Sequence, residues 1–378
     1  MNILADFWYF LAGYLVFCAW ENTRLFEKPP TLDRKRKKWP TVSILIPARN
    51  EEKRIKPCLR GMLTQDYPSY EILVLDDRST DNTANVVRSF SRYNKRLRLL
   101  EGKELPKGWL GKPWACYQLA KKANGEWLFF TDADTWHYPE TLKRTVQMAE
   151  AKQADVLSLF TRQITKTWME ALVVPVMAFH LLAFVPARWT LDRKNPLSRF
   201  AGVSGQFIFI RRKVYKAFKG HTVVKSEIVE DLKFGMLAVK RGYQVVLGNG
   251  CDFSFCRMYT SATEVWHGFS KNFFPAVGFS IPNFLQSFGF LLIVGVLPFV
   301  LLVKGPDDSL FWSALTLSLA LWSVRTLEAF LYGFNKLSVL FHPVGCLLFA
   351  LVGLNSARWF WHKRQGHWKG RVLHSPSR

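Results

Sequence analysis

Short apolar runs alternate with amphipathic stretches between Thr41 and about Gly250. The runs have the length of strands, and the stretches between them have the apolar spacing of helices. Expected strands lie at 42–46, 71–76, 97–100, 127–130, 156–160 and within 202–211. Expected helices lie at 52–63, from 82, at 114–122, from 139 and at 232–241. Strands that alternate with helices predict an α/β domain with a mostly parallel sheet covered on both faces.

Longer apolar segments flank this domain and predict N-terminal and C-terminal transmembrane helices. Three segments, at 284–303, 310–330 and 339–361, approach or exceed the ~20 apolar residues that a span requires. Arg325 and Glu328 lie within the second one, on the same helix face, and are expected to form a structural pair. The N-terminal run, at 7–20, is shorter than a full span, although flanking residues can extend it, and it lacks the features of a signal peptide.

The apolar segment at 168–189 is interrupted by Pro175, His180 and Pro186. We expect an interfacial helix that lies on the bilayer, with a buried core helix as the alternative. The expected organisation is therefore a membrane anchor at 1–27, a basic linker at 28–40, a catalytic domain at 41–255, an interfacial or acceptor-side segment at 256–283, a transmembrane region at 284–361 and a basic tail at 362–378.

The composition favours a membrane partner over nucleic acid. The formal net charge of +23 suits either one, but 49% hydrophobic residues and 15 Trp favour a bilayer with anionic lipid headgroups. No nucleic-acid-binding motif is present, so no nucleic-acid partner is expected. Five consecutive cations at 34–38 predict a cytoplasmic catalytic domain on the plasma membrane, unless they form only a solvated linker. Three further spans would then leave the basic tail outside, so the number of spans stays open.

Three carboxylate clusters carry the candidate chemistry. Asp76-Asp77 and Asp132-Ala133-Asp134 each follow an apolar strand, at the sheet edge where open α/β sheets bind ligands. Oxygen ligands of this kind suit Mg²⁺ or Mn²⁺, which can neutralise a diphosphate. The third cluster, Glu230-Asp231, can supply a general base, although acids at the start of a helix also favour the helix dipole.

Two further motifs supply polar groups near the same edge. The segment Pro47-Ala48-Arg49-Asn50-Glu51 follows the first strand, where Arg49 can face a diphosphate and Glu51 can accept hydrogen bonds from a nucleoside. A simple helix start with Asn50 as the cap is the alternative. Lys112, after Gly111, can reach phosphate oxygens as a point charge. The six cysteines form no Cys-x-x-Cys motif, which argues against a zinc site and predicts reduced thiols.

Together, in this order, these motifs resemble the family 2 glycosyltransferases with the GT-A fold, from about Val42 to Gly250. The resemblance implies a nucleotide-sugar donor, usually UDP-linked, and inversion at the anomeric carbon. It implies a divalent cation at Asp134, with Asp132 nearby, and Asp231 as the base, beside Glu230. It assigns donor binding to Pro47, Ala48, Arg49, Glu51, Asp76, Asp77, Lys112, Asp132, Ala133 and Asp134, with Glu51 and Asp77 at the nucleoside.

The Gln/Arg-x-x-Arg-Trp motif of processive synthases is absent from the sequence, which argues against polymer synthesis. The stretch around Arg257, His267 and Lys271 instead is similar to bacterial membrane glycosyltransferases that act on carotenoid acids, hopanoids and similar lipids. These three cations are candidates for binding the diphosphate or the acceptor, and binding of lipid headgroups is the alternative. The predicted function is metal-dependent transfer of one sugar to a membrane lipid acceptor. The alternatives are transfer to a polyprenyl phosphate and a non-catalytic nucleotide-binding membrane subunit.

Overall fold

The computed structural model describes residues 2–33, 36, 38–361 and 365–374. It divides into two compact units that are interleaved in sequence. The α/β unit comprises Phe26–Arg162 and Trp189–Met258, and the helical unit comprises Met1–Leu25, Gln163–Arg188 and Tyr259–Arg378. Residues 163–188 therefore belong to the helical unit although they lie in the middle of the catalytic segment.

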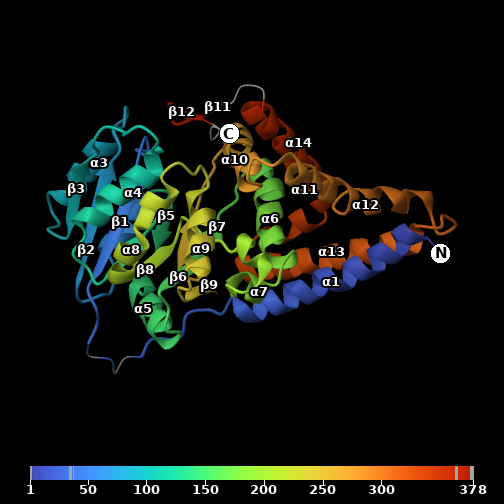
Figure 1. The fold of residues 1–378 in the computed structure, drawn as a ribbon, viewed down its shortest axis with the longest axis horizontal. Coiled ribbons are helices and arrows are strands. Elements are labelled where there is room, and N and C mark those ends of the chain that lie inside the picture. The colour runs from blue at the N-terminus through green and yellow to red at the C-terminus, as the bar shows by residue number, and fades with distance from the viewer. Residues whose placement is uncertain (1, 34–35, 37, 362–364, 375–378) are drawn as a thin grey trace. The chain divides into compact units, whose positions relative to one another are not determined.

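The strands and helices of the α/β unit follow one another much as the sequence predicts (Figure 1). The strands are β1 Val42–Ala48, β2 Tyr70–Asp76, β3 Leu97–Glu101, β4 Trp127–Phe130, β5 Thr135–His137, β6 Val156–Phe160, β8 Ile208–Arg211, β9 Val245–Asn249 and β10 Ser254–Cys256, with β7 Arg162–Gln163 at the unit boundary. The helices are α2 Ile55–Leu63, α3 Thr83–Ser91, α4 Gly111–Lys122, α5 Thr141–Ala151, α8 Arg212–Phe218 and α9 Glu230–Lys240, with 3-10 turns η1 Pro196–Phe200 and η2 Gly220–Val224.

The central sheet has seven strands in the order β3-β2-β1-β4-β8-β6-β9. Only β8 runs antiparallel to its neighbours, whereas the other pairings in this sheet are parallel. The prediction of a mostly parallel α/β sheet is therefore confirmed. The expected strand within 202–211 is limited to β8, because residues 204–206 form a loop whose groups bond to side chains from neighbouring elements.

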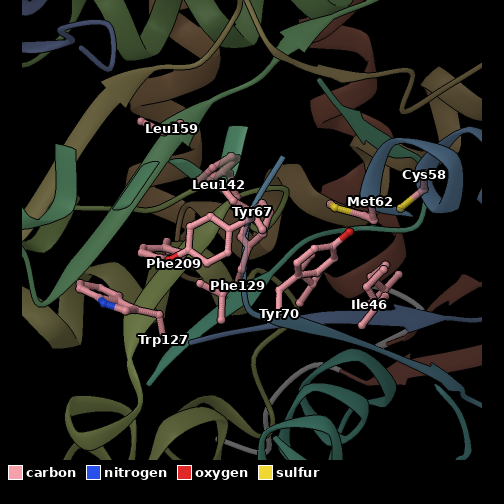
Figure 2. Close-up of a cluster of buried hydrophobic side chains, with 14 of the residues drawn as sticks. Ile46, Cys58, Met62, Tyr67, Tyr70, Trp127, Phe129, Leu142, Leu159 and Phe209 are labelled. Carbon is pink, nitrogen blue, oxygen red and sulfur yellow. The ribbon is translucent and has the colours of Figure 1, made fainter. Parts of the chain in front are cut away.

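Side chains that alternate along the strands build a separate core on each face of this sheet. In β1, Ile44 and Ile46 belong to the cluster shown in Figure 2, whereas Leu45 between them belongs to a second cluster on the other face. The first cluster packs α2 and α5 against the sheet through residues such as Met62 and Leu142, and the second packs α4, α8 and α9. Burial on both faces explains why the inner strands of the sheet consist mostly of apolar residues.

The helical unit contains the long apolar helices. Its elements are α1 Ile3–Leu25, α6 Trp168–Ala183, α10 Ala262–Ala276, α11 Ile281–Ile293, α12 Leu297–Leu301, η3 Leu302–Lys304, α13 Phe311–Tyr332, η4 Lys336–Val339, α14 His342–Trp361, β11 Gln365–Trp368 and β12 Arg371–His374, with α7 Ala187–Leu191 at the boundary. Within the part of the chain that the structure describes, four segments are long and apolar enough to cross a membrane, namely Ile3–Leu25, Ile281–Lys304, Phe311–Tyr332 and His342–Trp361. Helices that could span a membrane at both ends of the chain are thus confirmed.

Two features of the helical unit bear on its expected elements. The N-terminal helix has 23 residues, so residues that flank the apolar run at 7–20 extend it to the length of a span, as the sequence allows, and Asn22 within this extension is buried. The Asn22 amide donates to the carbonyls of Leu182 and Val185, both at 2.9 Å, and accepts from the Ala187 amide at 2.6 Å. Ten of the 16 residues of α6 are buried, and it packs against α1, α10, α13 and α14, which suits the alternative of a core helix, whereas the interfacial placement stays a prediction.

Arg325 and Glu328 form the expected pair within α13, and both side chains are buried. The expectations for the basic cluster at 34–38 fall mostly outside the described residues, since 34, 35 and 37 are not described. The same holds for residues 362–364 and 375–378 of the basic tail.

Candidate active site

Three predicted loops leave the same edge of the central sheet. The strands β1, β2 and β4 are parallel neighbours, so their C-terminal ends lie side by side. Asp76 is the last residue of β2, and Asp132 follows β4 by two residues. Pro47 and Ala48, which were expected in the loop, are the last two residues of β1. The topology therefore brings the first two acid clusters and the 47–51 segment to one edge, where open α/β sheets bind ligands.

Reciprocal hydrogen bonds lock the loops after β1 and β2 together. The Asn50 amide donates to Ser79 Oγ at 3.0 Å, and the Thr80 amide donates back to Asn50 Oδ1 at 2.9 Å. The Glu51 amide donates to Thr83 Oγ1 at 2.7 Å. Asn50 has a φ of 53°, a left-handed conformation that Asn tolerates better than most residues. Both loops are thus held in fixed positions before any ligand binds.

The predicted nucleoside and diphosphate groups lie on these locked loops. Arg49 Nη1 donates to the backbone carbonyls of Asp77 at 2.6 Å and Arg78 at 2.8 Å, so its guanidinium also joins the two loops. Glu51 is 7% exposed and Asp77 is 4% exposed. Glu51 Oε2 lies 3.8 Å from Arg54 Nη1, a positive charge that offsets part of the cost of burying this carboxylate.

Lys112 joins two of the three acid clusters. It is the second residue of α4, and its Nζ lies 2.8 Å from Asp132 Oδ1 and 3.1 Å from Glu230 Oε1. Burial alone would lower the pKa of Lys112, but the carboxylates of Asp132, Glu230 and Asp231 together raise it well above its usual value. The ammonium group is therefore a permanent positive charge. Its side chain keeps 37% exposure, so a phosphate can still reach it.

Asp231 lies beside this charge cluster at the start of α9. Its Oδ2 accepts from the Gly205 amide at 2.9 Å, and its Oδ1 accepts from the Leu232 amide at 2.9 Å. Burial, and then the neighbouring charge of Glu230, raise the pKa of Asp231 to about 6, although Lys112 and the two amides oppose the rise. A carboxylate with this pKa is mostly ionised at neutral pH and is basic enough to accept a proton from a reacting group.

The two acids of the Asp132-Ala133-Asp134 motif meet different neighbours. Asp132 pairs with Lys112, whereas Asp134 Oδ1 lies 3.6 Å from the Cys256 thiol. The Asp134 carbonyl accepts from the Arg257 amide at 3.4 Å, which brings that candidate residue next to the motif. Ala133, between the two acids, is buried.

Two buried thiols show which charged groups share one neighbourhood. Burial raises the pKa of Cys116, which is also influenced by the charges of Lys112, Glu230, Asp132 and Asp77. Burial likewise raises the pKa of Cys256, which is influenced by Asp134, Asp132 and Glu51. Each of the three acid clusters therefore has at least one member near one of these two thiols, and Asp132 lies near both.

Two of the sequence-predicted candidates belong to the other unit. His267 and Lys271 lie on α10 of the helical unit, where the His267 ring packs 5.8 Å from the Trp359 ring. Arg257 lies in the α/β unit. The three cations thus divide between the units, and their roles remain predictions.

Sequence reasoning missed Gly205, whose amide binds Asp231. The expected strand within 202–211 includes Gly202-Val-Ser-Gly205-Gln, although two glycines in four residues are a signal for a loop. The interlocking of Asn50 with Ser79 and Thr80 was also not predicted, because it joins residues about 30 positions apart.

Residues 43–218 match the family model described as Glycosyl transferase family 2. The 4,4'-diaponeurosporenoate glycosyltransferase of Staphylococcus aureus strain USA300 is 28% identical over 95% of this chain and 93% of its own length. The enzyme of the same description from the bovine strain RF122/ET3-1 is 29% identical with the same coverage. The mannosyltransferase PcManGT from Pyrobaculum calidifontis, in complex with GDP-Man and Mn²⁺, shares 17% identity at a TM-score of 0.55, over 94% of this chain and 99% of that one.

The chain therefore carries a family 2 glycosyltransferase domain with the GT-A fold, as its motifs predicted. It is a glycosyltransferase, and its similarity to the diaponeurosporenoate enzymes extends beyond that domain to nearly the whole chain.

Proposed function

We propose that the protein transfers a single sugar from a nucleotide sugar, most simply a UDP-sugar, to a carotenoid-type lipid acid. The observation that carries the proposal is the convergence of Lys112, Asp132, Glu230 and Asp231 at the edge of the sheet where the donor loops end. The acceptor class is supported by near full-length similarity to enzymes named for diaponeurosporenoate, the anion of a carboxylic acid.

The proposed reaction is a direct displacement with inversion. An acceptor oxygen forms a bond to the anomeric carbon while the bond from that carbon to the diphosphate oxygen breaks, and the nucleoside diphosphate leaves with the electron pair. The permanent charge of Lys112 stabilises the negative charge that develops on the leaving group. When the acceptor is a hydroxyl, Asp231 accepts its proton. A carboxylate acceptor is already ionised and requires no base.

The donor set is compatible with a divalent cation that binds together with the nucleotide. Among the residues the structure describes, no group of three or more His, Cys, Asp or Glu is arranged to hold a metal ion. However, Mg²⁺ commonly takes one or two protein carboxylates and completes its shell with phosphate oxygens and water. We propose Asp134 and Asp132 as those carboxylates, with Mg²⁺ or Mn²⁺ as the ion, which would supply positive charge at the diphosphate.

The four apolar helices support a membrane location for the acceptor. We propose that the protein resides in the plasma membrane with its α/β unit on the cytoplasmic side, where nucleotide sugars are made. The net charge of +23 suits contact with anionic lipid headgroups. The predicted division of the chain, with a catalytic domain at 41–255 between an anchor at 1–27 and a transmembrane region at 284–361, belongs to the same proposal.

The test is transfer by the purified protein in detergent. Labelled UDP-glucose, UDP-N-acetylglucosamine and GDP-mannose are each offered with a long-chain polyene carboxylic acid, the corresponding alcohol and a polyprenyl phosphate. We expect one sugar added to the acid, seen by mass spectrometry, together with release of the nucleoside diphosphate. Transfer to the polyprenyl phosphate alone would replace the proposed acceptor. Binding of nucleotide without transfer to any acceptor would contradict the proposal.

A further inference from the structure

Gly205 lies next to the two charges on which the proposed chemistry depends. Its amide donates to Asp231 Oδ2 at 2.9 Å. A β-carbon placed on Gly205 would lie 2.8 Å from Lys112 Nζ, closer than real β-carbons approach other atoms, and 3.0 Å from Asp231 Oδ2, which is tighter than most such contacts. Hence this position has no room for even a methyl group while Lys112 and Asp231 keep their places.

The need for glycine here does not come from the backbone conformation. Gly205 is not among the described glycines with a positive φ, so its conformation is open to other residues. The glycine instead leaves space for the Lys112 ammonium. This distinguishes it from Gly220, where φ is +48° and substitution would strain the backbone itself.

The loop around Gly205 is held on both sides. The preceding Ser204 amide donates to Ser158 Oγ at 2.9 Å, and the following Gln206 carbonyl accepts from Thr131 Oγ1 at 2.9 Å. Thr131 also directly precedes Asp132, so the loop is tied to the strand end that carries the partner of Lys112. Because the backbone is fixed, an added methyl group would be accommodated by movement of the flexible Lys112 side chain.

We propose that Gly205 is a positioning residue: its amide orients Asp231, and its missing side chain lets the Lys112 ammonium lie among Asp132, Glu230 and Asp231. The proposal rests on the proposed function for its effect on catalysis. In Gly205→Ala, Lys112 Nζ has to retreat by about 0.6 Å to reach the 3.4 Å of an ordinary contact. Displacements of this order at a reacting centre reduce rates by about 10-fold to 100-fold.

The same loop offers a matched control. A β-carbon on Gly202 would meet Leu232 Cδ2 at 2.7 Å, which is the end of a flexible apolar side chain and carries no charge. Gly202→Ala thus makes the same chemical change three residues away without touching Lys112. The experiment compares Gly205→Ala, Gly202→Ala, Lys112→Ala and the double variant Gly205→Ala/Lys112→Ala.

For each variant, kcat and the KM for the donor are measured, together with UDP and GDP affinity by calorimetry. We expect Gly205→Ala to lower kcat/KM about 10-fold or more, and Gly202→Ala to stay within about twofold of the unaltered protein. In the Lys112→Ala background, Gly205→Ala should have little additional effect, because the displaced ammonium is already gone. Equal effects of the two glycine substitutions, or additive effects of Gly205→Ala and Lys112→Ala, would overturn the proposal.

Thermal unfolding of the same four variants separates the two proposals. We expect Gly205→Ala to lower Tm in the unaltered background and to change it little in the Lys112→Ala background. If this coupling is present but no sugar transfer occurs with any donor, the proposed function fails while the positioning of Lys112 by Gly205 stands. If transfer occurs and neither kinetics nor Tm shows coupling, the positioning role fails alone.

Discussion

Replacing Asp231 by Asn should affect the enzyme differently for different acceptors. Asn keeps the size of the side chain and an oxygen that can accept from the Gly205 amide, but it cannot take up a proton. The substitution therefore removes the base while preserving the shape of the site. A hydroxyl acceptor depends on that base, whereas a carboxylate acceptor has lost its proton before it binds.

The size of the difference follows from the pKa of about 6 for Asp231. At pH 7 the ionised form exceeds the protonated form about tenfold, so nearly every molecule carries a competent base. General bases contribute about 10²–10⁴-fold to rate. We therefore expect Asp231→Asn to lower kcat with a polyene alcohol by about 10²–10⁴-fold. With the matching polyene acid the loss should be about tenfold or less, from positioning alone.

The assay is initial-rate transfer from one labelled nucleotide sugar to the alcohol and to the acid, which share the same chain length. Acidification gives an independent check, because protonation of Asp231 inactivates the base. Below pH 6 the rate with the alcohol should fall about tenfold per pH unit, whereas the rate with the acid should persist until the acceptor itself is protonated. Equal losses with both acceptors, or loss of ordered structure in the variant, would refute the reasoning.

Three further predictions follow from the same structure. Asp231→Asn should raise Tm at pH 7–8, because burial disfavours the charge that the substitution removes. The folded pKa of about 6 exceeds the ordinary pKa of 3.8, so the gain is up to about 3 kcal/mol at neutral pH and should vanish below pH 4. Unchanged stability at both pH values would contradict this. Asp134→Ala should abolish most sugar transfer, and the activity that remains should not respond to a chelator. If the unaltered protein keeps its full rate in the presence of chelator, the metal role is refuted. Arg325→Leu should destabilise the protein in detergent by about 3–5 kcal/mol, because it leaves the Glu328 charge buried without its partner. Arg325→Leu/Glu328→Leu should recover most of the lost stability, and equal Tm values for the single and double variants would contradict this.

The local sequence pattern was enough to predict the parallel sheet and the location of Asp76 and Asp132 at one edge of it. The runs 72–75, before Asp76, and 127–130, before Asp132, are continuously apolar, which indicates burial on both faces and so a parallel sheet. Parallel neighbours end at one edge, so the convergence of those acids follows from topology alone.

The pairings made across long sequence separations could not be predicted from the chain. Glu230 reaches Lys112 only because α9 and α4 begin beside the same strand ends, although the two residues are 118 positions apart in the sequence. The space required at Gly205 depends on where the Lys112 side chain lies, and the sequence around Gly205 does not indicate that position. Likewise, the polar Asn22 suggests the end of an apolar helix. The helix continues past it, and the buried Asn22 side chain bonds to the Leu182 carbonyl and the Ala187 amide.

The chain passes between the two units four times, at 25/26, 162/163, 188/189 and 258/259. Trimming both termini would therefore not yield a water-soluble catalytic fragment, since residues 163–188 would remain. Their helix α6 would then lack α1, α10, α13 and α14, and its ten buried residues would promote aggregation. A usable fragment has to delete this internal stretch as well and join Arg162 to Trp189 through a polar linker.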